Sequence, residues 1–294
     1  MRGYVDGMLE IDPARPPVTP RDAATVVLLR DTPAGYEVFL VRRHAKSGFM
    51  GGATVFPGGK LDEQDRDARI LARVRGRASA EAARVLDELD MPERALALFV
   101  AAIRETFEEA GVLLAEVARP DAIAAERARL EQGASFADVL DALGAELRLD
   151  WLVPLSRWVT PAVEPRRFDA RFFLTRIPPG QTAARDARET TEAHWLSPAD
   201  ALAHDLADRI LLPPPTLRTL ENLSVHAAID DVLEAARRGT PPLVRPAFVH
   251  DDDGPSLVLP GDPAHAERER VVAGPTRFVL ENGRFRSRDP RPRT

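Results

Sequence analysis

A long amphipathic helix from Pro92 to Ala110 is the most constraining feature of this sequence. At about 100° per residue, six of its apolar residues form one stripe along the helix. Those residues are Leu96, Phe99, Val100, Ile103, Phe107 and Ala110. Pro92 suits the first turn of a helix, and Gly111 suits the position after its last residue. The pattern therefore predicts one helix with defined ends.

Three glutamates lie together on the side of this helix away from the apolar residues. Glu105, Glu108 and Glu109 have the i, i+3, i+4 spacing that groups side chains on one helical face. Like charges at this spacing repel, and a hard divalent cation would turn that repulsion into binding, because Mg²⁺ prefers oxygen ligands. The alternative from the glutamates alone is a solvated acidic face.

A glycine pair upstream favours the metal site. Gly58-Gly59 follows Val55-Phe56-Pro57, and Asp65 follows Gly59 after five residues. Together with Arg104–Val112, this resembles the signature of the Nudix hydrolases. The sequence departs from the signature in having Asp65 for a glutamate and Thr106 for a bulkier apolar residue. It also places 38 residues between Asp65 and Arg104, where the family pattern has a much shorter spacer.

That long spacer is similar to one branch of the family, the coenzyme A diphosphatases that carry an insertion inside the signature. Two further stretches resemble the same branch, namely residues 39–59 and the segment from Arg157 to Phe173 with Arg166-Arg167-Phe168-Asp169. The resemblance covers roughly residues 22 to 220. It implies a Nudix-type α/β/α sandwich around a mixed sheet, and an enzyme that hydrolyses phosphoric anhydrides.

The resemblance also implies roles for single residues. The metal, Mg²⁺ or Mn²⁺, would be held by Glu105, Glu108, Glu109 and the backbone carbonyl of Gly58. Arg104 would pair with a glutamate, Glu108 being the one at i+4. For the general base, Glu189 is the first candidate and Glu192 the next; both can also be surface carboxylates before a strand. For the Gly58-Gly59 pair alone, an ordinary turn is the alternative.

Basic residues are the candidates for binding substrate phosphates, since arginine matches a phosphate with two hydrogen bonds. The candidates are Arg42, Arg43, Lys46, Lys60, Arg166 and Arg167. Each arginine can also be a solvated surface residue. Lys46 and Lys60, the only lysines, flank the glycine pair, which genomic bias towards arginine would also explain.

The resemblance leaves three functions open. The first is hydrolysis of coenzyme A or acyl-coenzyme A to adenosine 3′,5′-bisphosphate and (acyl-)4′-phosphopantetheine. A second is hydrolysis of another nucleoside diphosphate such as ADP-ribose. The third is a non-catalytic Nudix module that only binds its ligand, a reading disfavoured by the intact set of glutamates.

The composition of the chain restricts the kinds of partner that we expect. The net charge of −6 gives no basic field for nucleic acid, and the absence of cysteine excludes disulfides and a thiol nucleophile. No apolar run reaches membrane-spanning length, and the N-terminus lacks the apolar segment of a signal peptide. We therefore expect a small nucleotide substrate, no nucleic acid or membrane partner, and a cytoplasmic protein; a homodimer stays open.

The remaining pattern predicts the order of elements. Strands are expected at 23–30, 36–43, 53–56, 152–159, 168–177 and 193–196, and helices at 120–132, 135–146, 198–206 and 216–238. Residues 66–91 are expected to form one or two inserted helices. The Nudix domain would span 1–240. Residues 241–294 would form a proline-rich extension with short strands turning at Asn282-Gly283 and a disordered end from Arg286.

Overall fold

The structure is a computed structural model that describes residues 3–5, 9–11, 16, 18–45, 50–185, 190–251 and 254–290. Its centre is an eight-stranded mixed sheet with the strand order β12-β4-β3-β11-β10-β13, in which β5 also pairs with β4 and β6 with β3. The strands are β3 (Arg21–Thr32), β4 (Gly35–Arg43), β5 (Thr54–Val55), β6 (Gly58–Lys60), β10 (Val153–Val159), β11 (Phe168–Arg176), β12 (Thr190–Leu196) and β13 (Leu243–Val244). The β3–β11 and β10–β13 pairs are parallel, and the others are antiparallel.

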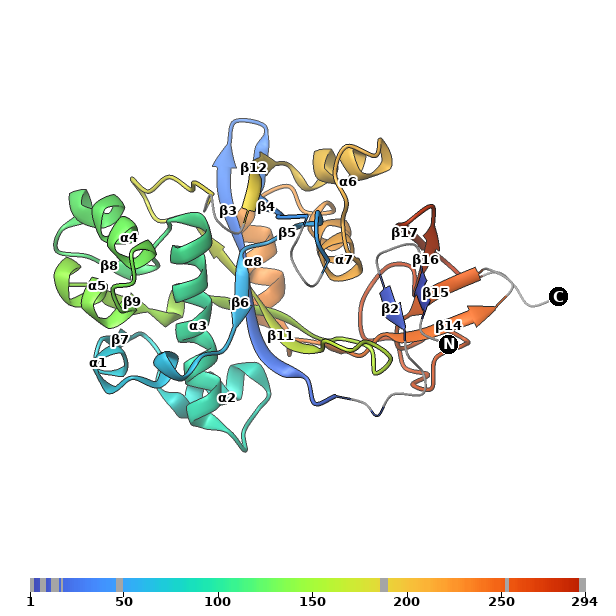
Figure 1. Ribbon diagram of the computed structural model, residues 1–294, viewed down its shortest axis with the longest axis horizontal. Coiled ribbons are helices and arrows are strands. Elements are labelled where there is room, and N and C mark those ends of the chain that lie inside the picture. The colour runs from blue at the N-terminus through green and yellow to red at the C-terminus, as the bar shows by residue number, and fades with distance from the viewer. Residues whose placement is uncertain are drawn as a thin grey trace.

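Helices cover both faces of this sheet. Side chains alternate along a strand, so β3 sends Val26 and Leu28 into the layer of α3 (Pro92–Ala110). Val27 and Leu29 enter the opposite layer, with α7 (Pro214–Leu223) and α8 (Ile229–Arg238). Figure 1 shows α3 on one side of β3 and β6 and α8 on the other. The α/β/α sandwich expected from the sequence is confirmed.

The inserted segment contains helices, as expected, together with a short strand. After the 3₁₀ turn η1 (Glu63–Arg66) come α1 (Ala68–Leu71), β7 (Val74–Arg75) and α2 (Ser79–Leu86). β7 joins a small sheet with β9 (Glu146–Arg148) and β8 (Ala115–Glu116), next to α4 (Ile123–Glu131) and α5 (Phe136–Leu143). Glu88 anchors the insertion to the main sheet, because its carboxylate accepts two hydrogen bonds from the buried Arg171, at 2.7 and 2.9 Å.

The expected helix over 216–238 is wrong in its extent. The structure has two helices, α7 and α8, with a break between Leu223 and Ile229. The Tyr36 hydroxyl donates to the carbonyl of Leu223 at 2.6 Å, satisfying a group at the end of α7. Pro214 and Pro215 lie in the first turn of α7, where the missing N–H of proline costs nothing. The prolines therefore begin this helix.

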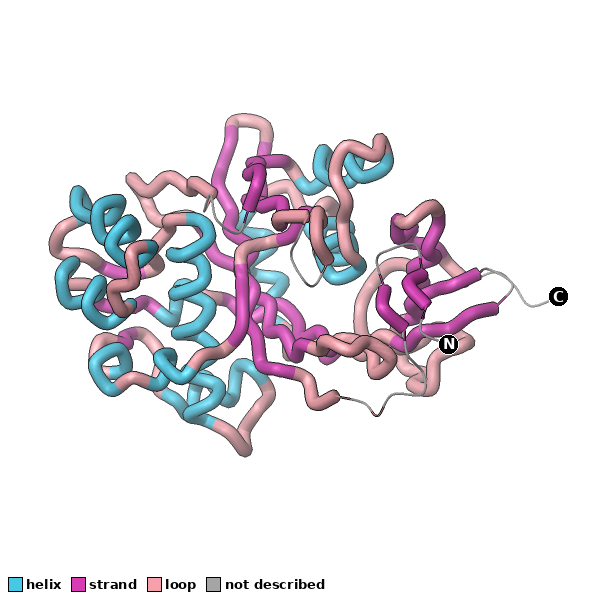
Figure 2. Tube along the Cα trace, viewed as in Figure 1, coloured by secondary structure: helices cyan, strands magenta, loops and turns pink. Residues whose placement is uncertain are grey.

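The C-terminal segment forms its own antiparallel sheet in the order β14-β15-β16-β17 (Figure 2). Its strands are β14 (Ala247–Asp251), β15 (Gly254–Val258), β16 (Arg277–Glu281) and β17 (Arg284–Arg288). The turn at Asn282-Gly283 is confirmed, with φ of 50° and 73°, the positive values that a tight hairpin requires. The expected disorder from Arg286 is wrong up to Arg288, which ends β17; residues 291–294 lie outside the described part. Leu257, Phe278 and Phe285 pack into the same apolar cluster as α7.

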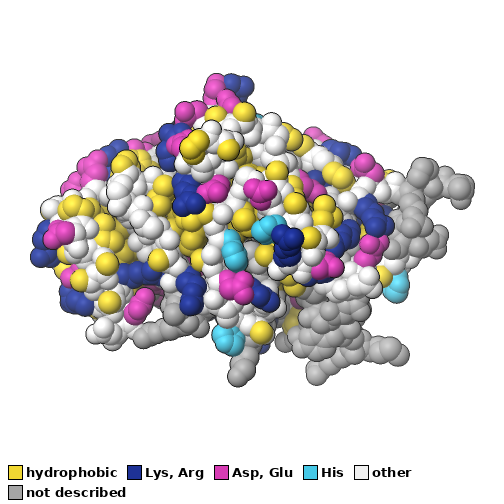
Figure 3. Space-filling view, turned by 90° about the horizontal axis from the view of Figure 1, so that it is seen from above, with side chains coloured by type: hydrophobic (Ala, Val, Ile, Leu, Met, Phe, Trp, Pro, Cys, Tyr) yellow, Lys and Arg dark blue, Asp and Glu magenta, His cyan; other side chains and the backbone are white. Residues whose placement is uncertain are grey.

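Acidic and basic side chains are interspersed over the face of the molecule seen in Figure 3. A short pair of strands, β1 (Gly3–Val5) and β2 (Leu9–Ile11), lies near the N-terminus. Within the described residues, every helix falls short of the length and apolarity that a membrane crossing demands. α6 (Pro198–Leu206) completes the elements and packs beside α7.

Candidate active site

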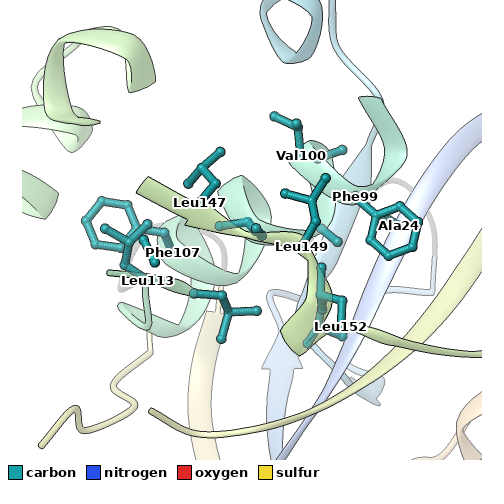
Figure 4. Packing of buried hydrophobic residues seen from close by; sticks show 14 of the residues in the cluster. Ala24, Phe99, Val100, Phe107, Leu113, Leu147, Leu149 and Leu152 are labelled. Carbon is teal, nitrogen blue, oxygen red and sulfur yellow. The ribbon is translucent and has the colours of Figure 1, made fainter. Parts of the chain in front are cut away.

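The long helix α3 places the three glutamates. It runs over the residues that the sequence predicted, and Gly111 ends it in the left-handed conformation with φ of 69°. Figure 4 shows Phe99 and Phe107 in the apolar cluster with Leu147 and Leu149. The polar side of the helix is also largely enclosed, because Glu109 is 6% exposed and the side chains of Glu105 and Glu108 are 14% and 35% exposed. The alternative of a solvated acidic face is therefore wrong.

The glycine pair is part of strand β6, which pairs with β3. The Gly58 N–H donates to Oε2 of Glu109 at 2.9 Å, so the two halves of the split signature meet. A Cβ on Gly58 would stand 2.4 Å from the carbonyl oxygen of Ala24, and a Cβ on Gly59 would stand 2.4 Å from Cδ of Glu105. A side chain at position 58 would therefore clash with backbone, and one at position 59 would displace the carboxylate of Glu105.

Arg104 connects the acids of the two halves. Its Nε and Nη2 donate to Asp65 at 2.7 and 3.0 Å, and Nη2 also donates to the carbonyl of Lys60 at 3.0 Å. Nη1 reaches Glu105 at 2.8 Å and Glu108 at 3.3 Å. The expected pairing of Arg104 with Glu108 is present, but the acid that accepts two hydrogen bonds from Arg104 is Asp65. Sequence reasoning missed that pair although Asp65 held the acidic position of the signature.

The electrostatics of this group favour a cation. Asp65, Glu105 and Glu108 are three acids around one guanidinium, that of Arg104, and Glu109 lies next to them on the Gly58 N–H. Burial raises the pKa of Glu105 to about 7, the charges of Glu108 and Asp65 add to that rise, and Arg104 opposes it. For Arg104, burial alone would lower the pKa, but the bonds to Asp65 and the charge of Glu105 outweigh it and raise the pKa above its usual range. A further positive charge here would stabilise ionised carboxylates.

A cleft of about 370 Å³ opens in front of these carboxylates. Gly58, Gly59, Lys60, Glu105, Glu108 and Glu109 line one part of it, and Arg43 lies there too. Nε of Arg43 is buried and has no hydrogen-bond partner in the described part of the chain. Apolar side chains including Trp158, Phe168 and Phe172 line much of the rest. The arrangement can bind a ligand that is anionic in one part and apolar in another.

Several predicted residues lie elsewhere. Arg42 is exposed and pairs with Glu192 at 3.0 Å, and Arg167 donates to the carbonyls of Thr160 and Val18 at 3.0 and 2.8 Å. Neither these residues nor the exposed Arg166 are among the described residues that line the cleft. Lys46 and Glu189 lie outside the described part of the structure.

One carboxylate in the cleft escaped sequence reasoning. Glu164, in the connection between β10 and β11, is 5% exposed and lines the cleft. Its place in the sequence, between Val163 and Pro165, carries no spacing that would single it out. Only the folding of this connection over the sheet brings it to the site.

The donor set fits a hard divalent cation by its chemistry, because all of its members are oxygen ligands. Among the residues that the structure describes, no three acidic or histidine side chains are already gathered in a metal-binding arrangement. The carboxylates instead bond to protein groups, Glu109 to the Gly58 N–H and Glu105 to Arg104. Binding a metal would therefore require these oxygens to turn towards it.

Comparison with known proteins places the chain in a family. The family described as NUDT19 Nudix domain matches residues 72–223, which include Arg104–Gly111. The acyl-coenzyme A diphosphatase NUDT19 of Homo sapiens is 30% identical over 286 residues, covering 81% of this chain and 75% of that protein. The Xenopus laevis protein of the same name is 28% identical over 294 residues, covering 84% and 76%.

A solved structure agrees. The NUDIX hydrolase from Alicyclobacillus acidocaldarius superposes with a TM-score of 0.61 at 30% identity, covering 74% of this chain and 96% of that one. Nudix hydrolases generally use divalent metals such as Mg²⁺. The sequence match, the shared fold and the convergence of both halves of the signature lead to one conclusion: this chain is an enzyme of the Nudix hydrolase family, in the group defined by the NUDT19 Nudix domain.

Proposed function

We propose that this enzyme hydrolyses the diphosphate of coenzyme A or acyl-coenzyme A. The products would be adenosine 3′,5′-bisphosphate and 4′-phosphopantetheine or its acylated form. The names of the relatives, acyl-coenzyme A diphosphatase, supply the substrate class. The observation that carries the proposal is the hydrogen bond from the Gly58 N–H to Glu109, at 2.9 Å, which joins the two halves of the split signature across the insertion.

Glu105, Glu108, Glu109 and the backbone carbonyl of Gly58 would hold Mg²⁺ or Mn²⁺. The ion supplies neutralisation of the diphosphate charge and a lower pKa for water when it is bound. Arg104 holds the rotamers of Glu105 and Glu108 through its Nη1, and Asp65 fixes the guanidinium from the other side. Such supporting contacts keep ligands oriented.

Arg43 and Lys60 are the cations that we assign to the substrate phosphates, because both line the cleft beside the carboxylates. The buried Nε of Arg43 would gain a partner from a phosphate oxygen. Arg42 and Arg167 bond to protein groups instead, so we place less of the phosphate recognition on them. We still propose Glu189 as the general base. The other candidate, Glu192, is exposed and its carboxylate accepts a hydrogen bond from Arg42.

A substrate panel with product identification tests the proposal. Coenzyme A, dephospho-coenzyme A and ADP-ribose would be incubated with the enzyme and Mg²⁺ or Mn²⁺, and the products identified by mass spectrometry. We expect the highest kcat/KM for coenzyme A, with adenosine 3′,5′-bisphosphate and 4′-phosphopantetheine as products. Loss of one charge-assisted bond to the 3′-phosphate, about 1.5–3 kcal/mol, corresponds to roughly ten- to a hundred-fold. A higher kcat/KM for ADP-ribose would contradict the coenzyme A assignment and leave the family assignment intact.

A further inference from the structure

The floor of the cleft crosses the sheet at right angles to its strands. Ala23 of β3 is paired with Lys60 of β6 on one side and with Ala170 of β11 on the other. Ala170 is in turn paired with Trp158 of β10, and all four residues line the cleft. Neighbouring strands lie about 4.8 Å apart, so three spacings separate β6 from β10 by roughly 14 Å. The carboxylates stand at the β6 end of this path, and Trp158 stands at the β10 end.

The two ends differ in charge. Arg43 and Lys60, the cations among the described lining residues, belong to β4 and β6 at the carboxylate end. Towards β10 the described lining includes the apolar residues Trp158, Phe172 and Pro246, and Leu257 of β15 also lines the cleft. The charged lining residue in the connection between β10 and β11 is a carboxylate, Glu164, and not a cation. The end of the cleft near β10 therefore suits the pantetheine arm of the substrate, which carries no phosphate other than those of the diphosphate.

Trp158 is a wall between two cavities. It is 4% exposed, and its Nε1 donates to Ser156 Oγ at 3.2 Å. A second cavity, of about 270 Å³, is also lined by Trp158, together with Ser156, Leu223 and Val232. Trp158 is thus the described residue that the linings of both cavities share, and removing its indole would connect the two spaces.

Resting on the proposed coenzyme A substrate, we infer that the pantetheine arm runs across the sheet towards β10 and that Trp158 limits the length of the acyl group it carries. The C-terminal segment takes part, because Pro246 and Leu257 also line the cleft. Each methylene buried in this space favours binding by about 0.8 kcal/mol, or about four-fold in kcat/KM. That gain ends when the acyl chain reaches the indole.

The test compares chain-length profiles. The kcat/KM values of the wild type, Trp158→Ala and Trp158→Phe would be measured with coenzyme A and its acetyl, octanoyl, dodecanoyl and palmitoyl thioesters. In Trp158→Ala we expect the optimum to move to longer acyl groups and the palmitoyl-to-acetyl ratio to rise at least ten-fold, whereas Trp158→Phe should stay closer to the wild type. Trp151→Ala is the matched control, because Trp151 lies outside the cleft beside Arg148 and should leave the profile unchanged.

Two results would overturn the inference. One is an unaltered profile in a folded Trp158→Ala protein. The other is an equal loss of kcat/KM for coenzyme A, all its thioesters and ADP-ribose, which would place the indole against the nucleotide.

A binding measurement tests the inference even if Trp158→Ala does not fold. It also does not depend on hydrolysis of the ligand. Trp151→Phe with Trp195→Phe leaves Trp158 as the only tryptophan. Titrated in chelator, its fluorescence should shift to the blue with dodecanoyl-coenzyme A and stay nearly unchanged with coenzyme A. Equal responses to both ligands would overturn the inference. An acyl-specific shift in a protein that cleaves neither ligand would support it, while the proposed function would have failed.

Discussion

Replacing Gly59 with alanine should disable the site by displacing one carboxylate. The new Cβ would stand 2.4 Å from Cδ of Glu105 and 2.4–2.5 Å from its two oxygens. Carbon atoms in contact are about 3.5 Å apart, so a shift of about 1 Å is needed. The backbone of α3 cannot supply it easily, because Ala101 and Ala102 on the same helix are fully buried. The carboxylate or strand β6 must therefore move.

A displacement of that size in catalytic geometry can cost about 100-fold in rate. We expect kcat of Gly59→Ala with unacylated coenzyme A, at saturating Mn²⁺, to fall by about that factor. Gly239→Ala is the matched control, since nothing lies within 4 Å of the Cβ it would add and its φ is −114°. Thermal melting would confirm that both variants fold. Wild-type kcat and metal dependence in Gly59→Ala would refute the assigned position of Glu105.

Three further predictions concern the acids. Glu108→Gln and Glu109→Gln should each lower kcat by several orders of magnitude, with melting temperatures close to the wild type; near-normal rates at saturating metal in both would remove the site. Activity should vanish in chelator and return with Mg²⁺ or Mn²⁺, and metal at a hundred times its Kd should stabilise the fold by about 2.7 kcal/mol, seen as a rise in melting temperature. An unchanged melting temperature with full activity in chelator would count against it. Glu88→Gln tests the anchor of the insertion. Burial alone would raise the pKa of Glu88, but the hydrogen bond and charge of Arg171 outweigh burial and lower it below 4.5. A lowered carboxylate pKa stabilises the fold above the unfolded value and loses that effect as pH falls through the folded value. The stability lost in Glu88→Gln, measured by urea unfolding, should therefore be full near neutral pH and shrink below pH of about 4.5; a pH-independent difference would contradict the assignment.

The sequence was sufficient to predict an element where the residues of that element alone determine its ends. Pro92, the apolar spacing and Gly111 set both ends of α3, and Asn282-Gly283 set the C-terminal hairpin. Each of these depends on backbone preferences within a few residues. The acidic face could be predicted for the same reason.

Contacts between distant segments could not be read in this way. The carbonyl of Leu223, where α7 ends, accepts from the hydroxyl of the distant Tyr36, and the acid that accepts two hydrogen bonds from Arg104 lies on the other side of the insertion. Glu164 and Trp158 belong to the site only because β11 lies beside β3 and β10 lies beside β11. Of the predicted arginines, Arg43 lines the cleft, whereas Arg42 pairs with the distant Glu192 and Arg167 donates to backbone carbonyls.

Anomalous diffraction from crystals grown with Mn²⁺ tests the central claim, that the split signature converges on one metal-dependent site. We predict an anomalous peak at about 2.0–2.2 Å from carboxylate oxygens of Glu105, Glu108 and Glu109. The same peak should be absent from crystals of a Glu108→Gln, Glu109→Gln double variant. A wild-type crystal saturated with Mn²⁺ that shows no peak at these carboxylates, while the enzyme in the same solution hydrolyses coenzyme A, would contradict the account.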